Sequence, residues 1–229
     1  MYKTLLIDLD DTLWDTRRNG KESLEEVYRD YNLDRFFTSF DSFYTVYFPN
    51  NLDLWAKYRN GEIDKQELIL ERFRYPLKPY MDCSEDFLLS LNEDFLNRTT
   101  LKTRLLPYAV EILSYLKPTY KIYIVSNGFE EVQYKKINNS GLSAFFDGII
   151  LSDTVGVNKP HPLIFREAMK EANASEEECL MIGDSWDADI IGAKNTGIDQ
   201  CWYDLGVEQP GDFRPTFLVR SLPELKEIL

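Results

Sequence analysis

The chain opens with a short apolar run that ends in acidic side chains. Tyr2 to Leu9 is apolar and β-prone, as expected of a strand buried on both faces of a parallel sheet. Asp8, Asp10 and Asp11 stand at its carboxyl end, where open α/β sheets bind their ligands. In an extended chain Asp8 and Asp10 lie on the same side, and such carboxylates repel each other unless a cation or a shared proton lies between them. The run therefore predicts either a site of chemistry or a solvated acidic turn.

The composition is that of a globular protein with a large core. The chain has 229 residues, of which 44% are hydrophobic and 28% charged. No apolar run is long enough to cross a bilayer and no basic leader precedes the first strand, so we expect a cytoplasmic protein without a membrane partner. The net charge of -13 argues against a nucleic-acid polymer as partner, but a metal ion and one or two lysines can still attract a small anionic substrate.

Cysteine and histidine usage excludes several kinds of site. Cys83, Cys179 and Cys201 are widely separated and form no CxxC motif, so we expect reduced, mostly buried thiols instead of a disulfide or zinc framework. His161 is the only histidine, which argues against a Ser-His-Asp triad and excludes a metal site made of several histidines. We expect His161 to be structural or exposed.

Residues 16–100 contain no predicted strand. Aromatic side chains recur at threes and fours between Phe36 and Phe48, which indicates packing between helices; stacking of these rings on a substrate base is the alternative. The segment is therefore predicted to be a helical insert. Its helices are expected over residues 17–31 and 84–96 and after Asp64, an expected N-cap with Glu67 three residues on.

From Leu105 onward the sequence alternates between strand and helix patterns. Such alternation implies right-handed crossovers and a parallel sheet with helices on both faces. We therefore predict an α/β fold with a Rossmann-like, doubly wound parallel-sheet core, residues 1–15 and 101–229, and an inserted all-helical cap domain, residues 16–100. The strands are predicted at 120–126, 146–151, 178–182, 200–203 and 217–219, and the helices at 107–116, 130–139, 162–172, 187–195 and 223–229.

Four polar motifs lie at the ends of predicted strands or in loops. DLDDT (8–12), VSNG (125–128), the lysine of NKPHP (158–162) and GDSWDAD (183–189) occur in this order. Together they resemble the four motifs of the haloacid dehalogenase superfamily of phosphohydrolases, and the resemblance covers nearly the whole chain. The YRNGEID turn (58–64) and the forms of the second and third motifs are also similar to the bacterial pyrimidine 5′-nucleotidase branch.

The resemblance implies a role for each carboxylate. Asp8 would be the nucleophile that forms an aspartyl-phosphate, and Asp10 would be the general acid and then the base. We expect the pKa of Asp10 to be raised, because that role needs it and a close acidic neighbour tends to raise it. Mg²⁺ would be held by Asp8, Asp184 and the backbone carbonyl of Asp10. Asp189 would orient Lys159 or a metal-bound water.

The same resemblance implies the contacts with substrate. Lys159 would place a positive charge beside the phosphoryl group, and Ser126 and Thr12 would donate hydrogen bonds to its oxygens. Asn127 and Gly128 would complete the substrate-binding loop. The plainer alternatives are a turn cap for Ser126 and a solvated surface position for Lys159.

The region around the site is also expected to select the substrate. The helical cap of this superfamily closes over the site and excludes water, so we expect substrate choice to lie there. Trp14 and Trp186 are expected to border the active-site mouth, and Asp187 is expected to be only a favourable charge in the first turn of a helix.

The predicted chemistry is phosphoryl transfer. Dehalogenases of the superfamily need neither Mg²⁺ nor a second acid, whereas this chain has both Asp10 and Asp184. We therefore expect a Mg²⁺-dependent phosphatase that acts on a small phosphorylated metabolite, a nucleoside 5′-monophosphate, as a monomer or small homo-oligomer. The alternatives are a sugar-phosphate or phosphoglycolate phosphatase, a phosphonatase, a phosphomutase, and a receiver-like signalling module that keeps the phosphoryl group.

Overall fold

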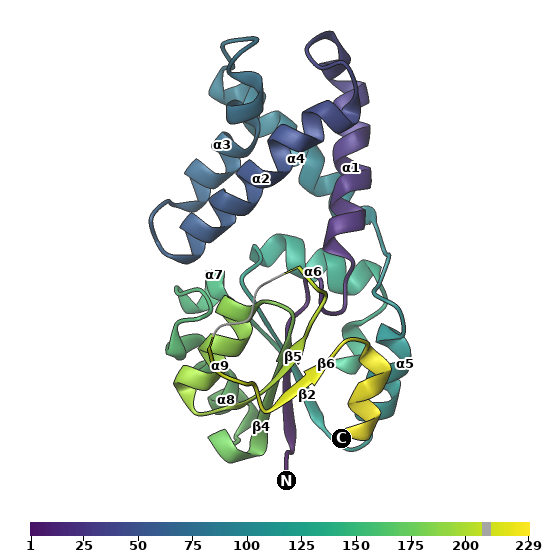
Figure 1. Ribbon diagram of the computed structural model, residues 1–229, viewed down its shortest axis with the longest axis vertical. Coiled ribbons are helices and arrows are strands. Elements are labelled where there is room, and N and C mark those ends of the chain that lie inside the picture. The colour runs from purple at the N-terminus through teal and green to yellow at the C-terminus, as the bar shows by residue number, and fades with distance from the viewer. Residues whose placement is uncertain (208–211) are drawn as a thin grey trace. The chain divides into compact units, whose positions relative to one another are not determined.

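The computed structural model describes residues 1–207 and 212–229, and the chain divides into two compact units (Figure 1). The α/β unit comprises residues 1–17 and 103–229, and the helical unit comprises residues 18–102. Across the described residues, no helix is long and apolar enough to pass through a bilayer.

The α/β unit is built on one parallel sheet. Among the described residues the sheet has six strands in the order β3-β2-β1-β4-β5-β6, and every neighbouring pair is parallel. The predicted doubly wound parallel sheet is therefore confirmed. The strands are β1 (Thr4–Ile7), β2 (Lys121–Ser126), β3 (Gly148–Leu151), β4 (Cys179–Gly183), β5 (Asp199–Tyr203) and β6 (Phe217–Val219).

Helices cover both faces of this sheet because successive side chains of a strand point to opposite faces (Figure 1). Leu5 and Ile7 of β1 pack in one cluster with Leu113 of α5, whereas Leu6 packs in the other with Phe165 of α8. The helices of the unit are α5 (Ala109–Leu116), α6 (Glu130–Asn139), α7 (Ser152–Val155), α8 (Pro162–Ala172), α9 (Ile191–Thr196) and the 3₁₀ turns η2 (Ser143–Phe145), η3 (Glu176–Glu178) and η5 (Leu222–Glu227).

The strand order places the end of β1 beside the end of β4. The chain winds from β1 outward to β3 on one side and from β4 outward to β6 on the other, so the direction of winding changes between β1 and β4. Ile7 pairs with Ile182, so both strands end at the same level. Such a switch point is where open α/β sheets form their ligand-binding crevice.

The helical unit contains no strand in its residues, all of which are described. Asp64 caps α3 by accepting the amide hydrogen of Glu67 at 2.8 Å, as predicted. The aromatic side chains pack against one another, with Phe43 stacked on Tyr28 and Tyr47 in contact with Phe73, which agrees with the packing interpretation. The helices are α1 (Thr16–Asp30), η1 (Leu33–Arg35), α2 (Phe40–Arg59), α3 (Lys65–Leu77) and α4 (Glu85–Leu101).

Two predicted helices near the C-terminus have a different form. The predicted helix at 187–195 begins as a wide π-helical turn, η4 (Trp186–Ile190), in which the Ile191 amide donates to the Trp186 carbonyl, and continues as α9. The side chain of Ser185 starts this turn by accepting the Ala188 amide hydrogen. The last predicted helix, 223–229, is the 3₁₀ helix η5.

Candidate active site

The turn after β1 holds the first motif in place. The amide of Asp8 donates to the carbonyl of Ile182 at 2.9 Å, so the contact between β1 and β4 continues past the end of β1. Asp11 has a left-handed φ of 58°, a conformation that aspartate tolerates better than most residues. Its carboxylate accepts from the backbone and the guanidinium of Arg17, both at 3.1 Å. These contacts fix the turn that carries the Asp8 side chain.

Lys159 is a buried part of the site, so the solvated alternative is wrong. Its Nζ lies 2.5 Å from Asp8 Oδ1, 2.6 Å from Asp189 Oδ1 and 2.6 Å from the carbonyl of Val125. An ammonium group has three hydrogens, and these three acceptors use all of them. Although burial alone would lower the pKa of Lys159, the carboxylates of Asp189 and Asp8 raise it above its ordinary value. Lys159 is therefore charged and bound to Asp8.

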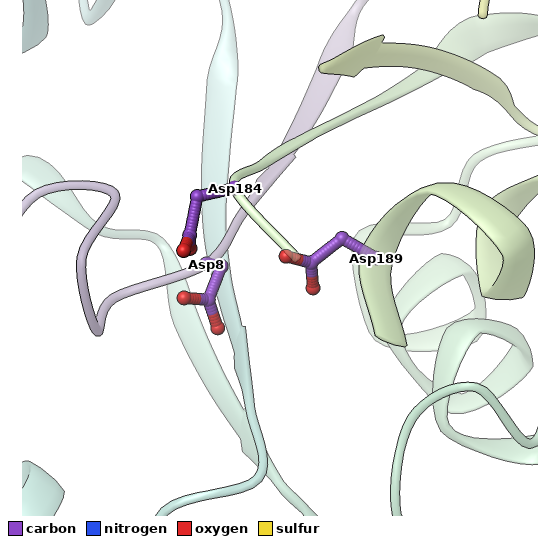
Figure 2. A group of neighbouring side chains, drawn as sticks. All are labelled: Asp8, Asp184 and Asp189. Carbon is purple, nitrogen blue, oxygen red and sulfur yellow. The ribbon is translucent and has the colours of Figure 1, made fainter. Parts of the chain in front are cut away.

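Three carboxylates lie close together, as Figure 2 shows, and two of them, Asp8 and Asp189, accept from the Lys159 ammonium group. Asp8, Asp184 and Asp189 each offer an oxygen, and these oxygens lie within 4.8 Å of one another. Burial raises the pKa of Asp8 to about 7, with the charges of Asp189 and Asp10 adding to the rise and Lys159 opposing it. Burial and the charge of Asp8 also raise the pKa of Asp184 well above its ordinary value. One ammonium group does not neutralise these three carboxylates, of which Asp8 and Asp189 are buried and Asp184 is half-buried.

The free oxygens of this cluster fit a hard divalent cation. Both oxygens of Asp189 already accept a hydrogen bond, Oδ1 from Lys159 and Oδ2 from the Ser185 amide at 3.0 Å. Asp8 Oδ2 and Asp184 Oδ2, by contrast, accept no hydrogen bond from any described residue. Carboxylate oxygens are ligands that Mg²⁺ and Ca²⁺ prefer. Asp8 and Asp184 could therefore hold the ion, and Asp189 holds Lys159.

The two predicted hydroxyl donors have different environments. Thr12 Oγ1 donates its only hydrogen to Asp184 Oδ1 at 3.0 Å and accepts from the Asp184 amide at 3.1 Å. Ser126 Oγ accepts from the Gly128 amide at 3.2 Å and from Gln133 Nε2 at 2.6 Å, and donates to no described residue. Thr12 therefore positions Asp184, whereas Ser126 keeps a hydrogen that can be donated to a ligand oxygen.

Asn127 and Gly128 make contacts within the protein. Asn127 donates from Nδ2 to the Lys159 carbonyl at 2.9 Å and accepts at Oδ1 from the Lys159 amide at 2.7 Å, which ties the loop after β2 to the loop before α8. A Cβ atom at Gly128 would lie 2.3 Å from Cδ of Gln133, so glycine leaves room for that side chain. Both residues, expected to bind substrate, support their neighbours in this structure.

Asp10 differs from its prediction. Oδ1 accepts from Thr16 Oγ1 at 2.6 Å and from Lys136 Nζ at 2.5 Å, and Oδ2 accepts from Gln133 Nε2 at 2.7 Å. Burial alone would raise the pKa of Asp10, but the Lys136 charge and these hydrogen bonds outweigh it and lower the pKa below its ordinary value. The expectation of a raised pKa is therefore wrong, because it counted the acidic neighbours and missed the lysine.

Gln133 and Lys136 are the residues near the site that sequence reasoning missed. Both lie on α6, which begins directly after the VSNG motif, and both are buried. In the sequence they stand beside Val132 and Ile137, the apolar residues of the same helix face. The sequence signal for them is a lysine and a glutamine on the apolar face of a helix that begins directly after a strand end.

Three further predictions can be checked against burial. Trp14 and Trp186 are both buried, at 0% and 4% exposed, so the expectation that they border an open mouth is wrong. Trp14 lies beneath Lys136, and Trp186 packs on Trp202. His161 is exposed and caps α8 by accepting the Leu163 amide hydrogen at Nδ1, as expected of a structural histidine. All three cysteines are free thiols, as predicted.

Comparisons with known proteins identify the family of this chain. The haloacid dehalogenase-like hydrolase family matches residues 2–197. The chain is 32% identical to the pyrimidine 5′-nucleotidase YjjG of Escherichia coli, over 98% of this chain and 96% of the relative. It is also 32% identical to a glyceraldehyde 3-phosphate phosphatase of Pyrococcus abyssi, over 90% of this chain and 83% of that protein.

A solved structure also matches nearly the whole chain. The HAD-hydrolase YfnB of Bacillus subtilis, bound to magnesium, superimposes with a TM-score of 0.89 at 31% identity and covers 99% of this chain and 98% of its own. The expected fold and the expected enzyme class, a phosphoric monoester hydrolase, are confirmed by these matches. The chain belongs to the haloacid dehalogenase-like hydrolase family.

Proposed function

We propose that this hydrolase is a Mg²⁺-dependent phosphatase that hydrolyses a small phosphate monoester through an aspartyl-phosphate at Asp8. The observation that carries the proposal is the cluster in which Asp8 lies between the ammonium group of Lys159 and the carboxylate of Asp184. A buried carboxylate held by a fixed cation on one oxygen, with its other oxygen free, is suited to attack phosphorus in line.

The reaction proceeds in two steps that balance in protons. In the first, an oxygen of Asp8 bonds to phosphorus while the ester P–O bond breaks. The leaving oxygen takes a proton that Asp10 must first gain, because the lowered pKa of Asp10 keeps it a carboxylate before substrate binds. In the second, water attacks phosphorus, its proton passes to Asp10, and the bond between phosphorus and Asp8 breaks. Ser126 donates its hydrogen to a phosphoryl oxygen, and Lys159 keeps Asp8 in place.

Asp8, Asp184 and the backbone carbonyl of Asp10 would hold Mg²⁺. Bound there, the ion would offset the carboxylate charges and stabilise the phosphoryl oxygens as a Lewis acid. Asp189 would keep Lys159 oriented. The match to a magnesium-bound relative supports this choice of ion.

We propose a nucleoside 5′-monophosphate as the substrate. Support comes from two relatives named pyrimidine 5′-nucleotidases, from Escherichia coli and Streptococcus pneumoniae, which are 32% and 30% identical over nearly the whole chain. A glyceraldehyde 3-phosphate phosphatase matches at similar identity, so a sugar phosphate is the second candidate. A comparison of kcat/KM for pyrimidine nucleotides, glyceraldehyde 3-phosphate and phosphoglycolate separates these candidates, and equal values for all three would contradict a nucleotide specialist.

The remaining expectations are proposals of the same kind. We propose a reducing compartment, the cytoplasm, because all three cysteines are free thiols and two of them are buried. We also propose a monomer or small homo-oligomer without a nucleic-acid partner, in keeping with the net charge of -13.

The proposed function is tested with Asp8→Asn. This change keeps the shape of the side chain but removes the nucleophile, so turnover of p-nitrophenyl phosphate with Mg²⁺ should fall more than about a thousandfold. Asp187→Asn, which removes an exposed carboxylate from the same motif, should keep the parent rate. Turnover at the parent rate in Asp8→Asn would contradict the assignment of Asp8 as the nucleophile. If the parent protein instead forms a stable phosphoprotein that releases no phosphate, the receiver-like alternative is favoured.

A further inference from the structure

The Asp10 carboxylate is held by three donors from two parts of the chain. Thr16 comes from the start of α1, and Gln133 and Lys136 come from α6. Both carboxylate oxygens accept, so rotation of the group would break at least one of these hydrogen bonds. Gln133 and Lys136 belong to none of the four sequence motifs.

Gln133 connects Asp10 to Ser126. Its Nε2 donates to Asp10 Oδ2 at 2.7 Å and to Ser126 Oγ at 2.6 Å. A carboxylate only accepts hydrogen bonds, so the amide NH₂ must be the side that faces Asp10. The side chain is fully buried and fills the space that a Cβ at Gly128 would need. Gln133 therefore fixes the distance between the proton-transfer group and the hydroxyl proposed to bind the phosphoryl group.

Lys136 holds the other oxygen. Its Nζ lies 2.5 Å from Asp10 Oδ1 and 4.6 Å from the centroid of the buried Trp14 ring. The side chain is 7% exposed, so the ammonium group cannot trade this carboxylate for water at low cost. Trp14 follows the first motif, and α6 follows the second, so the contact joins the two motifs.

We propose that Gln133 and Lys136 are positioning residues that hold the Asp10 carboxylate where it takes the proton of the attacking water. The inference rests on the proposed function, because it assigns a purpose to Asp10 within that reaction. It extends the site beyond the four motifs to the first turns of α6. General-base catalysis of this kind contributes about 10²- to 10⁴-fold to a rate, so loosening the base should cost a measurable part of it.

A substrate with a good leaving group makes it possible to measure the two chemical steps separately. p-Nitrophenolate leaves without needing a proton, so the first step with p-nitrophenyl phosphate does not depend on Asp10, whereas hydrolysis of the phosphoenzyme does. Lys136→Met keeps the length of the side chain and removes its ammonium group, and Gln133→Leu removes the amide at similar volume. Lys135→Met is the matched control, because Lys135 is the exposed neighbour on the same helix.

The experiment is rapid-mixing kinetics on the full chain with Mg²⁺. In Lys136→Met and Gln133→Leu, we expect a burst of one p-nitrophenolate per active site followed by steady turnover about 10- to 100-fold slower than that of the parent. KM for the substrate should not rise, and acid quenching should trap more phosphoenzyme than in the parent. Lys136→Arg, which restores a donor, should recover part of the steady rate, and Lys135→Met should match the parent.

The outcomes distinguish the inference from the proposed function. If Lys136→Met and Gln133→Leu match Lys135→Met, the positioning role is overturned while the phosphatase stands. A smaller burst with an unchanged rate per active site would mean that the residues only support folding, which also overturns it. If one variant does not fold, the other tests the opposite oxygen of the same carboxylate. No turnover by the parent with any phosphate monoester would instead overturn the proposed function itself.

Discussion

At the scale of single residues, the site depends on donor side chains whose hydrogens are all used in hydrogen bonds within the protein. The three hydrogens of Lys159 are all used, on Asp8, Asp189 and the Val125 carbonyl. Thr12 gives its single hydrogen to Asp184. Groups whose partners are all present need not reorganise when charge develops on the substrate, which is the main source of electrostatic catalysis.

Gly183 offers a test at this scale. A Cβ there would lie 2.2 Å from Asp189 Oδ2, so Gly183→Ala must displace the carboxylate that holds Lys159. We expect the free energy of unfolding to fall by about 1–3 kcal/mol and kcat to fall at least about tenfold, measured by denaturant melts and steady-state turnover. Gly20→Ala is the control. A Cβ at this position in α1 meets nothing within 4 Å, and alanine favours a helix more than glycine does, so the free energy of unfolding should rise by about 0.5–1 kcal/mol. Equal stability of the two variants would contradict this account.

At the scale of elements, the sequence predicts best where local signals are strong. The bounds predicted for the helices at 130–139 and 162–172 are those of α6 and α8, because a strand end or an N-terminal proline marks the start and Ser140-Gly141 or Asn173 marks the end. The wide turn η4 was missed, because its form depends on Ser185 and on the space that Asp189 needs. Such tertiary requirements leave no periodic pattern.

For the site, too, the sequence predicts the residues that belong to local motifs and misses those that depend on tertiary contacts. The four motifs name residues by type and spacing, and Asp8, Asp184, Asp189, Lys159 and Ser126 lie together in the structure. The partners of Asp10 come from the buried face of α6, and the sequence pattern of that face does not show which residue they contact. The lowered pKa of Asp10 therefore could not be predicted without the contact to Lys136.

Asp147 links three elements and gives a pH prediction. Its carboxylate accepts from the Ile122 amide of β2 at 2.8 Å and pairs with Lys117, which follows α5, at 2.8 Å. Burial alone would raise the pKa of Asp147, but Lys117 and the Ile122 amide lower it. A carboxyl whose pKa is lower in the folded state adds stability above its unfolded pKa, about 3.8, and loses it as the pH falls through the folded value.

Asp147→Asn should therefore be less stable than the parent at pH 7, by about 0.5 kcal/mol, because water screens the charge at this exposed position and reduces the usual worth of such a hydrogen bond. The difference should shrink as the pH is lowered from about 5 towards 3, because the parent loses the charge that the variant lacks. Urea melts over this pH range measure it. Glu227→Gln, at an exposed carboxylate, is the control and should show no difference. A constant gap between Asp147→Asn and the parent at all pH values would contradict the prediction.

At the scale of the whole molecule, the cluster joins distant parts of the chain. Asp8 follows β1, Asp184 follows β4, and Lys159 precedes α8. The expected cap domain, residues 16–100, stays a prediction as an independent domain, although residues 18–102 form a compact unit. A cation bound between Asp8 and Asp184 would connect the two halves of the sheet, and it would bind only where both are folded.

Mg²⁺ should therefore raise the melting temperature of the chain. The ion relieves repulsion among the three carboxylates of the cluster, and a ligand at 100 times its Kd adds about 2.7 kcal/mol to the stability of the native state, or several degrees. Thermal melts over a range of MgCl₂ concentrations measure the shift. Asp184→Asn should abolish it, whereas Asp187→Asn at the exposed carboxylate should retain it. A shift that persists in Asp184→Asn would contradict the assigned ligands.

The place of β1 in the sheet also decides when the enzyme can be completed during translation. β1 is synthesised before β2 and β4, yet it pairs with both, so one of its edges stays unpaired until residue 126 has been made and the other until residue 183 has been made. Residues 18–102 are contiguous and emerge in full before either strand is made. The carboxylate at position 8 is therefore synthesised long before the residues that surround it, so a nascent chain carries no assembled active site until residue 184 has been made.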